Sequence, residues 1–167
     1  SGGHADAWHV TTDTIEKADA DVLERDTAVY TLATARLSRA DIPADPLAVI
    51  DRARSVVAGY DDASTFDLGP VCSALNALRE ATAEFIADAG GHTPKLDSIV
   101  KTLTRLNFTT EGQFEQDPAE GRPPFPRLQA VETLPELDGN DERFLELQLR
   151  RARNEVVGEI RELRESL

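Results

Sequence analysis

The chain contains no methionine, a single cysteine and only three histidines in 167 residues. One cysteine excludes an internal disulfide framework and any zinc cluster built from cysteine thiolates. That residue, Cys72, lies in an apolar helical stripe, which predicts a buried and chemically inert thiol. No apolar run approaches the roughly 20 residues of a membrane span, and no signal-peptide pattern is visible. We therefore expect a soluble chain of unknown compartment, with no membrane partner.

Basic residues are scarce, and lysine is the scarcest of them. The chain has 18 basic against 31 acidic residues, and its formal net charge is -13. A surface of this sign repels phosphate, so we expect no nucleic-acid partner. Only Lys17, Lys95 and Lys101 are lysines. Two explanations of this acidic, lysine-poor composition stay open: adaptation to high salt, where self-repulsion is screened, and a GC-rich genome.

Apolar residues recur over most of the chain at the three- and four-residue spacing of amphipathic helices. This spacing predicts five helices, at about residues 19–38, 45–59, 67–89, 94–106 and 141–167. Asp45 followed by Pro46 is typical of a helix start, because the carboxylate caps one free amide and proline removes another. In the first helix we expect Leu23, Tyr30 and Leu37 to share the packed face.

The region between the fourth and fifth helices lacks a helical period and is rich in proline. Residues 107–137 contain five prolines, and Phe108, Phe114 and Phe125 favour packing of this segment against the helices. No stretch alternates like a strand. The sequence therefore predicts an all-α helical bundle of about five amphipathic helices, with a long proline-rich crossover before the last helix.

The last helix carries an apolar seam that some surface must cover. The seam consists of Leu149, Ala152, Val156, Ile160 and Leu163. Other helices of the same chain can bury it, or a second copy can. From the residues alone, the seam is therefore either bundle core or a dimer interface.

The opening stretch "SGGHADAWHVTTDT" places His4 and His9 beside the only tryptophan, Trp8. Imidazole is a common zinc ligand. A catalytic zinc ion, however, normally takes three protein ligands, and no cluster lies nearby in the sequence. By themselves, these residues are also compatible with a terminal segment and an ordinary loop.

Read as a whole, "AWHVTTDTIEKADADVLERDTAVYTLATARL" resembles the end of the catalytic domain of the M28 family of zinc aminopeptidases. An aromatic-His pair followed by a Thr-rich loop and "DT" carries the last ligand of that family's two-zinc site. The resemblance implies that His9 is this metal ligand and that Trp8 lies on the substrate side.

A second block extends the resemblance to the rest of the chain. "NFTTEGQFEQDPAEGRPPFPRL" and "DERFLELQLRRARNEVVGEI" resemble the helical region of M28 members related to the transferrin receptor and glutamate carboxypeptidase, which joins two subunits. Residues 1–18 would then be a remnant of the peptidase domain, and residues 19–167 a helical dimerisation domain. This implies a homodimer attached to an upstream catalytic domain.

The other residues of the family's zinc site have no counterpart here, so the resemblance assigns no catalytic residue to this chain. It implies zinc in the parent protein but no stably bound zinc and no activity in the isolated chain. Two alternatives stay open. The chain is part of a complete metalloaminopeptidase in which His9 completes the site, or it is a stand-alone helical interaction module.

Overall fold

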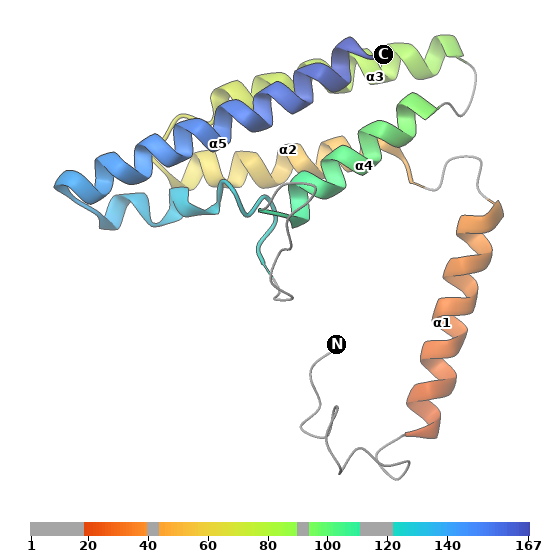
Figure 1. Cartoon of the computed structure of the whole chain (residues 1–167). Helices are drawn as coiled ribbons and strands as arrows, with labels where there is room; N and C mark the ends of the chain where they lie inside the picture. Colours follow the sequence, from red (N-terminus) through yellow and green to blue (C-terminus); the bar gives the residue numbers. More distant parts are fainter. Residues whose placement is uncertain (1–18, 40–43, 90–93, 111–121) are drawn as a thin grey trace. The chain divides into compact units, whose positions relative to one another are not determined.

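The computed structural model describes residues 19–39, 44–89, 94–110 and 122–167. Within these ranges it contains α-helices and short 3-10 helices but no strand (Figure 1), which confirms the predicted all-α class and the crossover before the last helix. The helices are α1 (Ala20–Arg39), α2 (Pro46–Ala63), α3 (Gly69–Ala89), α4 (Pro94–Phe108), η2 (Gln129–Glu132), η3 (Leu134–Glu136) and α5 (Gly139–Glu165).

The chain divides into two compact units, at a different place from the predicted domain boundary. One unit is Ser1–Pro43, which includes α1, and the other is Ala44–Leu167, which includes all the remaining helices. Residues 1–18 lie outside the described residues. The domain boundary at 18/19, which rests on the family resemblance, therefore stays a prediction.

Helix α1 begins and ends within one residue of its predicted bounds. The Asp19 carboxylate caps it by accepting hydrogen bonds from the amides of Asp21 (2.9 Å) and Val22 (3.1 Å). Within the unit of residues 1–43, however, the expected packed face is not buried, because α1 has no buried residue there. Leu23 and Tyr30 are 63% and 73% exposed. Helical spacing places residues on one face, but burial requires a second surface against that face.

Helix α2 starts as predicted and ends later than predicted. The Asp45 carboxylate accepts a hydrogen bond from the Leu47 amide at 2.9 Å, and Pro46 is the first helical residue. The helix does not stop at Gly59 but continues to Ala63. The reason is tertiary packing, because the last turn buries Tyr60, whose hydroxyl donates to the Pro124 carbonyl oxygen at 2.7 Å.

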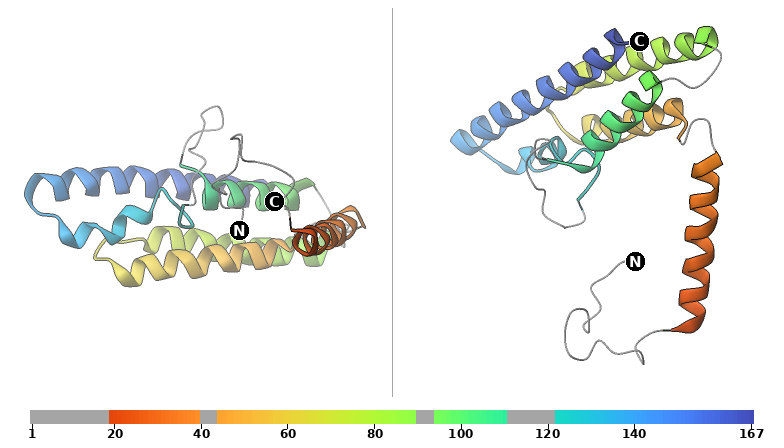
Figure 2. Two further views of the ribbon diagram at one scale, coloured as in Figure 1. Left: turned by 90° about the horizontal axis from the view of Figure 1, so that it is seen from below. Right: turned by 45° about the vertical axis from the view of Figure 1, so that its right-hand side comes forward.

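Helices α2–α5 form two layers, with α2 and α3 in one layer and α4 and α5 in the other (Figure 2). Helix α3 packs against α2 and α5, and α2 also packs against α4. The core between the layers takes one face from each helix. Its fully buried aliphatic residues include Ile50, Val57, Val71, Leu75, Leu78, Leu96, Ile99, Leu103 and Leu106. Within each helix these residues lie three, four or seven positions apart, which agrees with the amphipathic spacing in the sequence.

The described part of the crossover packs against the bundle, as its aromatic content predicts. Phe125 is 1% exposed, and Leu128, Val131 and Leu134 are also buried. Phe108 differs from the prediction, because it belongs to α4 and is 63% exposed. Phe114 lies outside the described residues. The second half of the crossover therefore contributes buried side chains to the core, in addition to those of the four helices α2–α5.

The seam of α5 is covered within the chain itself. Leu149, Val156, Ile160 and Leu163 are buried, and Ala152 is partly buried. Helix α5 contacts α3, α4 and both 3-10 helices. Of the two alternatives left open by the sequence, the structure therefore places these residues in the bundle core.

Candidate functional site

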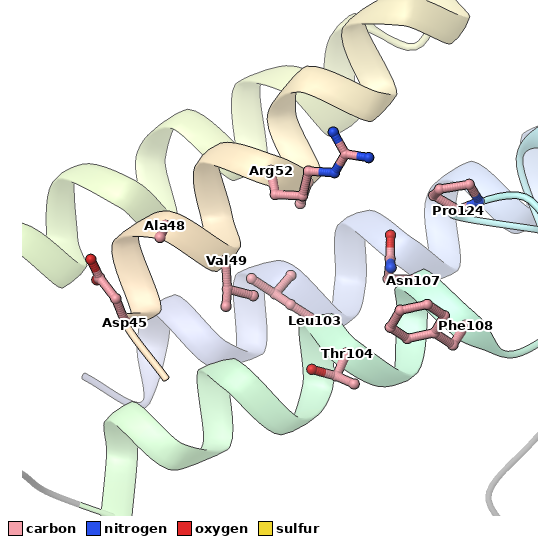
Figure 3. A pocket seen from close by; sticks show the side chains of 10 residues that line it. Asp45, Ala48, Val49, Arg52, Leu103, Thr104, Asn107, Phe108 and Pro124 are labelled. Atoms are coloured by element: carbon pink, nitrogen blue, oxygen red, sulfur yellow. The ribbon is translucent and has the colours of Figure 1, made fainter. Parts of the chain in front are cut away.

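A pocket of about 470 Å³ opens between α2 and α4 (Figure 3). Helix α2 and its N-cap supply one wall, α4 supplies the other, and the crossover closes one end with Pro124. The lining residues are Asp45, Ala48, Val49, Arg52, Ala53, Leu103, Thr104, Asn107, Phe108 and Pro124. Most of them are apolar at the pocket surface, as is usual for sites that bind small molecules.

Asn107 has a buried side-chain atom that lacks a hydrogen-bond partner. Its side-chain oxygen Oδ1 is buried and accepts no hydrogen bond. A buried acceptor without a donor costs free energy, because it has lost its hydrogen bonds to water. In Figure 3 this oxygen points away from α4, towards the side where Arg52 and Pro124 lie. The main-chain carbonyl of Asn107 is satisfied, since it accepts from the Phe125 amide at 3.1 Å.

The end wall of the pocket is held in a strained conformation. Phe125, which follows Pro124, has a φ of 52°, in the left-handed region that bulky residues rarely adopt. Burial of its ring and the hydrogen bond from its amide to Asn107 hold it there. Tyr60 holds Pro124 from the α2 side through the 2.7 Å hydrogen bond described above. Burial raises the pKa of the Tyr60 hydroxyl, and the nearby Glu132 carboxylate adds to this effect.

Replacing Tyr60 with phenylalanine should lower the free energy of unfolding by about 0.5–1.5 kcal/mol, the net value of one hydrogen bond. The effect should also depend on pH. Because the folded state raises the tyrosine pKa, the contribution is fully present below pH ~10 and is lost as pH rises through the folded-state value. Urea unfolding at pH 7 and pH 11 measures both effects. An unchanged difference between the two proteins at both pH values would contradict the assigned hydrogen bond.

Two clusters of ion pairs lie outside the pocket. Arg127 of the crossover reaches Glu155 at 3.7 Å and Glu159 at 3.8 Å, and Arg105 of α4 also pairs with Glu159. These pairs join the crossover and α4 to α5.

On the other layer, Asp51 of α2 accepts hydrogen bonds from Arg79 and Arg54, each at 2.8 Å. The Arg79 guanidinium, followed by that of Arg54, lowers the pKa of the Asp51 carboxyl. Ionised and held by two guanidinium groups, this carboxylate is suited to joining α2 and α3 and poorly suited to proton transfer.

The candidate metal ligand lies outside the described residues. His9, Trp8 and His4 fall outside the described residues, as does His92. Within the described ranges, no group of three or more His, Cys, Asp or Glu side chains could hold a metal ion. The described residues therefore do not by themselves provide a zinc site.

Cys72 differs from its prediction in burial. It is partly exposed, not buried. Burial nevertheless raises the pKa of its thiol, and the Asp61 carboxylate adds to the effect. A raised pKa leaves less of the nucleophilic thiolate at neutral pH, which agrees with an inert role.

The pocket was missed by sequence reasoning, because residues 107 and 108 were assigned to the crossover. One signal was available. Leu103 with Asn107, and Thr104 with Phe108, are spaced by four residues, so that a helix extended by half a turn aligns each pair on one side. The contribution of Pro124 could not be found in this way, since it comes from a distant part of the chain.

Comparison with known proteins finds no matching family model, no matching curated protein and no matching solved structure. Among the helices of the described ranges, none is both long enough and apolar enough to cross a membrane.

Proposed function

We propose that this chain is a helical self-association module of an M28-type zinc aminopeptidase, without catalytic activity of its own. The peptidase part of the proposal rests on the sequence resemblance, in which His9 and Trp8 match the end of a catalytic domain and the rest matches a dimerisation region. In the parent protein, zinc would be held jointly by His9 and an upstream domain. The interaction part rests on one observation in the structure: within the unit of residues 1–43, α1 buries none of its apolar residues.

Helix α1 has many large apolar side chains that are exposed. Its exposed hydrophobic residues are Val22, Leu23, Val29, Tyr30, Leu32 and Leu37. An isolated helix of 20 residues is only marginally stable in water, and most helical stability in proteins comes from packing of an apolar face. Leu23, Tyr30 and Leu37 lie seven residues apart and so share such a face. Contact with a partner surface would stabilise this helix.

The charges of α1 favour a second copy in antiparallel orientation as that partner. Asp21, Glu24 and Asp26 lie in its first half, whereas Arg36 and Arg39 lie in its last turn. Arg25 breaks the pattern but is paired with Asp26 at 2.8 Å. Antiparallel pairing places the acidic half of each helix beside the basic end of the other, while parallel pairing opposes like charges. Either arrangement can be two-fold symmetric, as most homodimers are, so the charges decide between them.

Sedimentation equilibrium of the 167-residue chain tests this proposal. We expect a reversible dimer, and Tyr30→Glu should raise its dissociation constant by about 10- to 30-fold, because the carboxylate would lie in the apolar centre of the contact. Thr31→Glu is the matched control. It adds the same charge one residue along the chain, about 100° around the helix, and should leave the dissociation constant nearly unchanged.

Each other outcome has a distinct meaning. If the unsubstituted 167-residue chain were strictly monomeric, self-association would be contradicted. The stand-alone module with a different partner would then be favoured. Equal effects of Tyr30→Glu and Thr31→Glu would remove the apolar face of α1 from the interface. Zinc-dependent hydrolysis of an aminoacyl-p-nitroanilide by this chain alone would contradict the absence of activity and support the reading in which His9 belongs to a complete site.

A further inference from the structure

The first half of α5 has an outward side that differs in character from the rest of the unit 44–167. A helix turns by about 100° per residue. Five residues of α5 lie about 100–160° around its axis from the buried Leu149, and we call them the outer face of α5: Arg143, Phe144, Leu147, Arg150 and Arg151. This face is separate from α1 and from the pocket between α2 and α4.

Within the unit of residues 44–167, the outer face of α5 is exposed. Phe144 is 63% exposed and Leu147 is 48% exposed, and the three arginines of the face are exposed as well. Aromatic residues and arginine are the types most enriched at protein interfaces and among the residues that dominate their binding energy. We propose that the outer face of α5 binds an acidic amphipathic helix of a partner protein. This proposal does not depend on the proposed function.

The charge of this face is opposite in sign to that of the whole chain. The chain has a formal net charge of -13, yet the charged residues of the outer face are all arginines. The acidic residues of the same stretch, Asp141, Glu142 and Glu146, lie within about 80° of Leu149 around the axis, nearer to the core. Helical spacing therefore separates the two signs and leaves the basic one facing outward.

Two of the three arginines are available to a partner. Arg150 is paired with Glu146 on its own helix at 3.2 Å. Arg143 and Arg151, by contrast, form no ion pair with any residue that the structure describes. Their guanidinium groups can therefore bind carboxylates of another molecule without first breaking an ion pair within the described residues. Bidentate pairs between arginine and a carboxylate are among the strong hydrogen-bonded contacts.

An acidic amphipathic helix complements both features of the face. Its apolar residues can cover the exposed surface of Phe144 and Leu147, and its carboxylates can pair with Arg143 and Arg151. The face is small for an interface, with two apolar residues on two turns of one helix. We therefore expect weak, reversible binding, with a dissociation constant of about 10–100 μM.

The same charges disfavour two other occupants of the face. If two copies met through their α5 outer faces, the arginines of one would lie against the arginines of the other, and like charges at an interface cost free energy. An anionic membrane would attract the arginines, but a flat lipid surface also approaches the rest of a chain whose net charge is -13 and repels it. A single acidic helix can contact this face alone.

Fluorescence anisotropy with two labelled peptides tests the proposal on the 167-residue chain. The first is a peptide of about 18 residues, long enough for five helical turns, with leucine along one helical face and glutamate on the other. The second has glutamine in place of every glutamate. We expect the glutamate peptide to bind with the dissociation constant given above and the glutamine peptide to bind about 10-fold more weakly, because it cannot form ion pairs. Raising the salt concentration from about 0.05 M to 0.5 M should weaken only the first.

Variants of the chain locate the binding site. Arg151→Glu reverses one charge of the face and should raise the dissociation constant of the glutamate peptide by about 10-fold or more. Phe144→Ala removes its largest apolar side chain and should raise the constant by about 5- to 10-fold. Arg164→Glu is the matched control for charge. It makes the same change at an exposed position of the same helix, about 20 Å along the axis, and should bind like the parent.

Each other result would overturn the proposal in a different way. If the parent chain bound neither peptide up to about 1 mM, the face would not be a docking surface. Equal affinity for both peptides would contradict the role of the arginines, and equal effects of Arg151→Glu and Arg164→Glu would exclude this face as the site. If Phe144→Ala instead weakened self-association in sedimentation equilibrium, the occupant would be a second copy. Binding to phosphatidylserine vesicles but to neither peptide would assign the face to a membrane. The comparison of the two peptides uses the parent chain, so it stands even if a variant does not fold.

Discussion

Replacing Ile160 with glutamate should leave the 44–167 unit largely unfolded at pH 7. The Ile160 side chain is 0% exposed, in the middle of the buried face of α5. A carboxylate there would lose its hydration, and even after relaxation the penalty for a buried, unpaired ion is several kcal/mol. Natural domains have only about 5–15 kcal/mol of total stability. The loss of the helical far-UV circular dichroism signal at 25 °C measures the result.

Leu147→Glu is the matched control for Ile160→Glu. It makes a similar hydrophobic-to-glutamate change on the same helix, at a position that is 48% exposed. Surface changes usually alter stability by less than about 0.5 kcal/mol, so this variant should melt like the parent. If Ile160→Glu instead folded normally and lost only self-association, α5 would be an interface, not core, and the assignment of its seam would be wrong.

Replacing Leu78 with alanine should lower the free energy of unfolding by about 2–5 kcal/mol, the usual range for a buried leucine. Leu78 is 0% exposed on α3, which packs against both α2 and α5. Because α3 is held by packing against both of these helices, we expect the cavity to close only in part and the loss to lie in the upper half of that range. The Leu78 main-chain carbonyl oxygen accepts a hydrogen bond from the Thr82 hydroxyl at 2.7 Å. The substitution removes only the side chain, so this hydrogen bond can remain.

Urea unfolding measures this loss, with the midpoint falling by roughly 1–5 M if the slope is about 1–3 kcal/mol per molar. Leu32→Ala, on α1, makes the identical chemical change where the side chain is 51% exposed. It should have little effect on the same transition. A loss below 1 kcal/mol for Leu78→Ala would mean that this face of α3 packs loosely, and the packing of α3 against α2 and α5 would have to be revised.

Local chemistry explains why several helix ends could be predicted. Asp19 and Asp45 cap their helices through hydrogen bonds to amides two or three residues away, so the sequence contains both partners. Pro94 opens α4 for a similar local reason. The end of α2 was wrong because a glycine stops a helix only when it adopts a left-handed conformation, and the contact of Tyr60 with Pro124 makes continuation more favourable.

The candidate pocket could be predicted only in small part. Helical spacing predicts which residues of α2 and of α4 share a face. It does not predict that α2 lies close to Pro124, which is about 70 residues further along the chain. The missing hydrogen bond of Asn107 is likewise a property of its surroundings. The sequence identifies the asparagine but does not show whether its side-chain oxygen is hydrogen-bonded.

Over the described residues, the sequence by itself determined the secondary structure class, the number of α-helices, most of their starts and the apolar face of each, because these depend on spacings of three or four residues and on local caps. It also determined the acidic surface. Only the tertiary structure decided which apolar faces are covered. The apolar residues of α1 are not buried within the unit of residues 1–43, whereas those of α5 are packed against other helices of the unit 44–167. Burial depends on a second surface of complementary shape, and that surface is supplied by residues far away in the sequence.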